Sequence, residues 1–268
     1  MNDLSLIFLQ LYEIAILSIR EAFRKKFVLS VILMSVLFLV IDFNCERNFA
    51  NSTNDAVTGY SIDLAITFFV MSFLNMLISI VIPSGLIADE MENKTYTMIL
   101  ARPIHRMTYI MGKILGVFTL VAGNLVFVLL FYSAINAAKN NIPPSVLWKS
   151  TGFMLINYFM LISLVSFLTL FINRTAGILG SLGLVFFTAV SNLSFLIAGP
   201  MKVEPNIWRD IAYWSLPQFG TIFLYSISFI ASIDWDSKYG IYTLYHSSVW
   251  IILLLAIIYI TFNRKELN

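Results

Sequence analysis

The stretch "ADEMENKTYTMILARPIHR" (residues 88–106) lies between two long apolar runs and decides how the rest of the chain is arranged. It holds three carboxylates, three basic side chains and one of the two histidines, although only 12% of the 268 residues are charged. So many charged side chains are expected to be exposed to water rather than buried in a bilayer. The stretch is therefore either a plain exposed connector that fixes topology or a surface that a partner binds.

The composition is that of a membrane protein. The chain is 59% hydrophobic with a mean hydropathy of +0.84, whereas soluble domains are about 45–50% apolar and about 25% charged. A net charge of +2 and the lack of a basic tract argue against a nucleic-acid partner. Cys45 is the single cysteine, which excludes an intrachain disulfide and a thiolate metal cluster.

Apolar run lengths predict an all-α polytopic membrane protein that forms a single transmembrane domain over residues 1–268. A crossing needs about 20 apolar residues, and six segments qualify: 27–43, 62–88, 112–135, 147–172, 177–199 and 245–262. Residues 1–26 place polar groups at helical spacing against a broad apolar face, which predicts an amphipathic helix at the membrane surface. If this segment crossed instead, Glu13 and Arg20 would lie unpaired in the bilayer.

Residues 200–244 decide on which side the chain ends. The run "GTIFLYSISFIASI" (220–233) is short for a crossing, and runs of this length are more often re-entrant or interfacial. If 206–233 enters and returns, most of the 17 basic residues fall on one side, as the positive-inside rule expects for the cytoplasm. Both termini and residues 89–111 are then cytoplasmic, and 200–244 is external. A full crossing would place the tail opposite the N-terminal basic cluster.

The predicted spans lack ionisable groups near their centres, where carriers and proton relays need them. Their mid-span polar residues are mainly amides and hydroxyls, and three amides are candidates for a substrate pathway: Asn75, Asn157 and Asn192. No hydrolase motif and no phosphate-binding G-x-x-x-x-G-K-[ST] loop occurs, so we expect no enzymatic activity in this chain. An ATP-independent carrier and a membrane anchor or scaffold remain as alternative functions.

The charged stretch itself predicts a short amphipathic helix over residues 89–102. Acids at its start and bases at its end suit the helix macrodipole, and Glu90 and Lys94 stand four residues apart with the acid first. Pro103 disfavours helix at the residue before it, which ends the element.

This loop resembles the cytoplasmic loop of ABC transporter permeases of the type-2 exporter class. That loop begins E-x-E-x-G-T, continues through a leucine-rich turn to R-P-I-x-R, and is followed by G-K. The matching positions are Glu90, Glu92, Thr95, Leu100, Arg102, Pro103, Ile104, Arg106, Gly112 and Lys113. Lys94 departs from the pattern, because the family has a glycine there.

The resemblance implies a function that composition alone does not give. In that family the loop is the coupling element seated in a separate ATPase subunit, which holds ATP and Mg, and two permease protomers form the pathway. This chain would then bind no cofactor or metal of its own. It would act in a bacterial or archaeal plasma membrane, exporting or translocating a substrate that the resemblance does not identify, as a homo- or heterodimer.

Overall fold

The computed structural model describes residues 3–49, 56–92, 106–139, 144–198, 207–230 and 237–265. Its regular elements in these ranges are all helices, which confirms the predicted helical class. The helices are α1 (Asp3–Arg24), α2 (Lys26–Phe49), α3 (Ala56–Glu92), α5 (Arg106–Lys139), α6 (Pro144–Phe171), α7 (Arg174–Ala198), α8 (Ile207–Ser215), α9 (Phe219–Ile230) and α10 (Ser237–Lys265).

Five of these helices are long and apolar enough to cross a membrane: the stretches are Ile66–Leu86, Met107–Ala134, Val146–Phe171, Arg174–Phe195 and Gly240–Phe262. They coincide with five of the six predicted crossings, so the chain is a polytopic membrane protein. The remaining prediction, 27–43, falls on α2. Its described apolar part, Lys26–Ile41, is shorter than a full span, and six crossings therefore remain a prediction.

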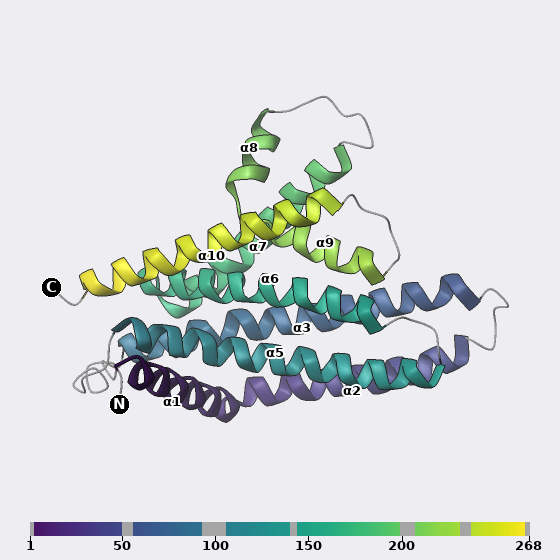
Figure 1. Cartoon of the computed structure of the whole chain (residues 1–268), viewed down its shortest axis with the longest axis horizontal. Helices are drawn as coiled ribbons and strands as arrows, with labels where there is room; N and C mark the ends of the chain where they lie inside the picture. Colours follow the sequence, from purple (N-terminus) through teal and green to yellow (C-terminus); the bar gives the residue numbers. More distant parts are fainter. Residues whose placement is uncertain are drawn as a thin grey trace.

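The long helices form a bundle in which α6 is the central member. It packs against α3, α5, α7, α9 and α10, and 61% of its apolar span is buried, against 22% for the spans in α7 and in α10. Figure 1 shows that α1 begins, α3 ends, α5 begins and α10 ends at one end of the bundle. The end of α3 and the start of α5, which flank residues 93–105, therefore lie at the same end of the bundle as the start of α1 and the end of α10.

Helix α1 packs along α5, and two glycines of α5 allow their backbones to approach closely. A Cβ atom at Gly112 would lie 2.7 Å from Ile14, and one at Gly116 would lie 2.7 Å from the Ala15 carbonyl oxygen. Small residues spaced four apart commonly allow such contacts between membrane helices. The chain bends at Lys25 before α2 begins, so a helix exists as predicted within residues 1–26; its position at the membrane surface stays a prediction.

The prediction that a separate helix begins at Asp89 is wrong, because α3 continues through Pro83 to Glu92. Alanine, leucine, methionine and glutamate follow Pro83, and all four are strong helix formers. Acidic groups at a helix C-terminus are disfavoured by the macrodipole, but cations from other helices pair with Asp89, as described below. Residues 93–102 of the predicted helix lie outside the described residues.

The described part of segment 200–244 contains two short helices, α8 and α9, and the beginning of α10, which starts at Ser237, before the predicted crossing at 245. Helix α9 has 12 residues, fewer than the about 20 that a crossing requires. It packs against α6 and α7, and at Gly220 a Cβ atom would lie 2.9 Å from the Ala189 backbone. Its burial among long helices is compatible with a segment that enters the membrane and returns.

Candidate functional site

The predicted coupling residues flank or fall within a segment that the structure leaves undescribed. Glu90 and Glu92 stand in the last turn of α3, and Arg106 begins α5; their side chains are not among those described. The other predicted coupling positions lie outside the described residues: Thr95, Leu100, Arg102, Pro103 and Ile104. The structure therefore locates the two ends of the predicted coupling element.

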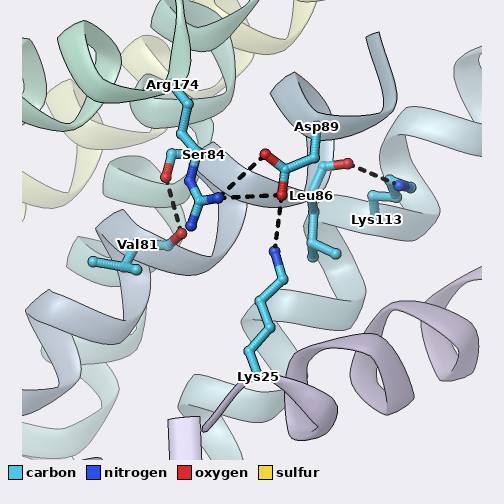
Figure 2. Close-up of polar contacts among 7 residues, drawn as sticks. All are labelled: Lys25, Val81, Ser84, Leu86, Asp89, Lys113 and Arg174. Carbon is cyan, nitrogen blue, oxygen red and sulfur yellow. Dashed lines mark hydrogen bonds and ion pairs between the residues drawn. The ribbon is translucent and has the colours of Figure 1, made fainter. Parts of the chain in front are cut away.

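A cluster of charged side chains surrounds the end of α3 next to this segment. Lys25 Nζ lies 3.4 Å from Asp89 Oδ2, and Arg174 Nη1 lies 3.3 Å from both Asp89 carboxylate oxygens. Figure 2 shows the two cations approaching the same carboxylate from different sides. We call Lys25, Asp89 and Arg174 the Asp89 cluster. It joins the α1–α2 junction, the end of α3 and the start of α7.

Neighbouring residues make room for the Asp89 cluster and extend it. A Cβ atom at Gly85 would lie 2.6 Å from Lys25 Nζ and 3.2 Å from Arg174 Cζ, so a larger residue there would displace the two cationic side chains from their present positions. Lys113 is buried on α5, and its Nζ donates to the Leu86 carbonyl oxygen at 3.0 Å (Figure 2). The same Nζ lies 5.2 Å from the Tyr109 ring centroid. The end of α3 is thus bound to α5 as well.

The contribution of the Asp89 cluster to the free energy of folding depends on how exposed its side chains are. The side chains of Lys25, Asp89 and Arg174 retain 31%, 38% and 41% of their accessible surface. Ion pairs this exposed contribute about 0.2–1 kcal/mol each. The cluster therefore contributes little to global stability, and its distinctive property is that it connects helix ends that are far apart in sequence.

The three candidate pathway amides lie in different surroundings. Asn75 accepts a hydrogen bond at 3.0 Å from Asn124 Nδ2 and donates to the Met71 carbonyl oxygen, so it joins α3 to α5 inside the bundle. Asn157 Nδ2 donates to the Phe219 carbonyl oxygen at 3.4 Å, whereas its buried Oδ1 has no partner in the described part of the chain. Asn192 is fully buried beside Gly220.

A groove of about 510 Å³ lies between α3, α6, α7 and α9, and we call it the membrane groove. Asn157 lines it, Asn192 lies behind its lining residue Gly220, and Asn75 does not line it. Its lining is Phe69, Ser72, Phe73, Met76, Met154, Asn157, Tyr158, Leu161, Leu182, Val185, Phe186, Ala189, Phe219, Gly220 and Phe223. Sequence reasoning therefore found one polar residue of the groove.

Among the described residues, no group of three or more His, Cys, Asp or Glu side chains could hold a metal ion. Sequence reasoning missed the cluster, although it placed Lys25, Asp89 and Arg174 on the same side of the membrane. The missing information was which residues of distant helices meet.

Comparison with known families identifies the chain. No curated protein matches it. A model of the family described as "ABC-2 family transporter protein" matches residues 12–267, a range that contains Lys25, Asp89, Arg174 and every residue that lines the membrane groove. The chain therefore belongs to the ABC-2 family of transporter proteins and is a permease of the ABC-2 type.

Proposed function

We propose that this chain is the membrane-spanning subunit of an ABC transporter, and that it couples ATP hydrolysis by a separate ATPase subunit to export or translocation of a substrate across the membrane. The family match over residues 12–267 is the observation that carries this proposal. ATP and Mg would bind to the ATPase, and a second permease protomer would complete the pathway. Both termini and residues 93–105 would face the cytoplasm.

The Asp89 cluster supports a mechanical role for the segment 93–105. This segment connects the end of α3 to the start of α5, and both ends are held by described contacts. Because Asp89 also pairs with Lys25 and Arg174, displacement of the end of α3 would act on the α1–α2 junction and on α7. An ATPase that moved segment 93–105 would thereby move several helices together.

Outward-facing apolar surface supports a protomer that meets lipid and a second protomer. In α7 only 22% of the apolar span is buried, and Leu179, Phe186 and Phe187 expose more than half of their surface. Helix α9 would enter the membrane from the external side and return, because it is too short to cross.

The test reverses charge at both ends of the predicted coupling element, in a Glu90→Lys, Glu92→Lys, Arg106→Glu variant. Each lost contact costs about 1–3 kcal/mol if it is desolvated at an interface and less at its rim, so the combined change should lower association with the ATPase at least tenfold. Co-purification in detergent with a co-expressed ABC ATPase subunit measures association, and vesicle transport assays measure coupling.

A control variant reverses Arg264 and Glu266 in the C-terminal tail. It should keep normal association, and both variants should insert at normal levels because the changed residues lie outside the predicted spans. Full association and transport in the triple variant would reduce segment 93–105 to a connector and remove the mechanical part of the proposal. Absence of any associated ATPase from the unmodified chain would contradict the proposal as a whole.

A further inference from the structure

The α1–α2 junction carries exposed basic side chains that the described helix contacts do not use. Arg20 and Arg24 near the end of α1 and Lys26 at the start of α2 are all exposed. Lys25 Nζ lies 3.4 Å from Asp89, but the other three cations form no ion pair or hydrogen bond among the described residues. We call Arg20, Arg24 and Lys26 the junction surface. Its charges are available to a partner.

Helix α1 presents two different flanks to its surroundings. Ala22 marks the side that is buried against the bundle. At about 100° per residue, Tyr12 and Phe23 lie on one flank of the opposite side, where they expose 65% and 45% of their surface. Arg20 and Arg24 lie next to them on the other flank, four residues apart and therefore on one face. An apolar flank beside a basic flank is typical of a helix at a lipid headgroup layer.

The junction lies at the level where the outward surface of the bundle becomes wholly apolar. From Phe27 to Ile41 no residue is ionisable, and Leu33 in this stretch exposes 60% of its surface. Lys25 contacts Asp89, which follows directly after the candidate span Ile66–Leu86 (Figure 2). Two helices therefore place the edge of the bilayer at the junction. Cations at this level meet the phosphates of the headgroups.

The charge of the junction surface favours one class of lipid. Glu21 is the acid nearest to it on α1, so three cations stand against one carboxylate. A zwitterionic headgroup brings a cation of its own, whereas an anionic headgroup brings a negative charge that the surface lacks. Guanidinium groups bind phosphate oxygens in a bidentate manner. An acidic protein surface would match the same charge, but only a lipid also accounts for the apolar flank and for α2.

We propose that the α1–α2 junction binds an anionic phospholipid, with its phosphate on Arg20, Arg24 and Lys26 and its acyl chains along the exposed apolar side of α2. Binding of this lipid does not depend on the proposed function. Its assignment to the cytoplasmic leaflet rests on the topology of the proposed function. Since Lys25 stays paired with Asp89, the lipid adds to the contacts that hold the junction and does not replace them.

The test compares phosphatidylglycerol with phosphatidylcholine of the same acyl chains, on the purified full-length chain in a non-ionic detergent without the ATPase. Native mass spectrometry measures how much of each lipid is retained from an equimolar mixture. We expect at least fivefold more phosphatidylglycerol, because each cation near a headgroup layer strengthens binding about fivefold. Glycerol phosphate at the same concentration should not displace the lipid, because it has no acyl chains to lie along α2.

The variants separate charge from folding. Arg20→Gln, Arg24→Gln should lower retention of phosphatidylglycerol at least tenfold and leave retention of phosphatidylcholine unchanged. Its thermal unfolding without added lipid should match that of the unmodified chain, since neither side chain forms an ion pair or hydrogen bond among the described residues. Arg20→Lys, Arg24→Lys keeps both charges and should keep most of the selectivity.

A single substitution has a matched control. Arg24→Gln alone should lower retention of phosphatidylglycerol about fivefold. Lys149→Gln also removes one exposed cation, at the start of α6, and should leave the selectivity unchanged.

Several results would overturn the inference. Equal retention of the two lipids, or unchanged selectivity in the double glutamine variant, would reject the site. Displacement by glycerol phosphate would mean a site for soluble anions, and a double variant that lost ATPase association but kept lipid selectivity would mean a protein contact. If lipid selectivity fails while the ATPase still co-purifies, the transport function stands without this site. If selectivity holds while no ATPase binds, the site stands and the proposed function fails.

Discussion

At the residue scale, the Asp89 carboxylate is shared by two cations from other parts of the chain. The pairs with Lys25 and Arg174 are partly exposed, so a double-mutant cycle of Asp89→Asn and Arg174→Gln should give a coupling energy of about 0.5–1 kcal/mol. Thermal unfolding in detergent measures each variant. Asp89→Asn should lower the apparent Tm slightly more than Arg174→Gln, because it removes both pairs.

Salt provides the control for this cycle. Partly exposed ion pairs are screened by added electrolyte, so the coupling energy should fall when unfolding is repeated in about 1 M salt. A coupling energy near zero at low salt would show that Asp89 and Arg174 do not interact. Ser133 lies on α5 and makes an exposed hydrogen bond within that helix. A double-mutant cycle that combines Asp89→Asn with Ser133→Ala should therefore give no coupling energy.

At the element scale, α1 and α5 provide a matched pair of glycines on one helix. A Cβ atom at Gly116 would lie 2.7 Å from the Ala15 carbonyl oxygen, whereas one at Gly123 would contact nothing within 4 Å. Gly116→Ala should therefore destabilise the α1–α5 contact by about 1–3 kcal/mol through overpacking. Gly123→Ala should be neutral or stabilising by about 0.5–1 kcal/mol, since alanine loses less backbone entropy in a helix.

Hydrogen exchange of α1 measures this difference locally. Faster exchange of α1 amides in Gly116→Ala, with unchanged exchange in Gly123→Ala, is the expected outcome. Equal exchange in both variants would mean that α1 is not held by this contact. The sequence contains the signal for it, because Gly112 and Gly116 are four residues apart in an apolar run; only the structure shows that α1 is the partner.

Other elements show where sequence reasoning succeeds and where it fails. The predicted span limits at 27, 147, 172 and 177 lie within three residues of the ends of α2, α6 and α7, because they follow apolar run length and local charge. The predicted start at Asp89 is wrong because the compensating cations come from Lys25 and Arg174, which are remote in sequence. Likewise, Asn75 and Asn157 look alike as mid-span amides, and only tertiary packing separates a helix contact from a groove position.

At the scale of the whole molecule, the arrangement of helix ends leads to a prediction about sidedness. The start of α1, the end of α10 and the end of α3 share one end of the bundle (Figure 1). In a Cys45→Ser background, single cysteines at Lys94 and Lys265 should react only with a reagent present on the cytoplasmic side. External labelling at either position would reject the proposed topology.

The same background tests whether segment 200–244 returns to the side from which it enters. Cysteines replacing Lys202 and Lys238 should both react with an impermeant reagent added outside, because α9 is shorter than a crossing. External labelling of only one of them would mean that the segment crosses the membrane. A cysteine at Lys94 is the internal reference for reagent leakage.

Because one carboxylate pairs with two cations, the Asp89 cluster also restricts which amino-acid substitutions can compensate for one another at its three positions. Replacing Arg174 by an acidic residue would place that residue beside the Asp89 carboxylate, and the two negative charges would repel. Replacing Asp89 by a basic residue would restore attraction to position 174, but the new cation would then be repelled by Lys25. A single compensating substitution therefore restores one attraction and creates one repulsion. Variants that regain the lost helix contacts should accordingly carry neutral residues at both positions, or changes at all three, rather than a simple exchange of acid and base.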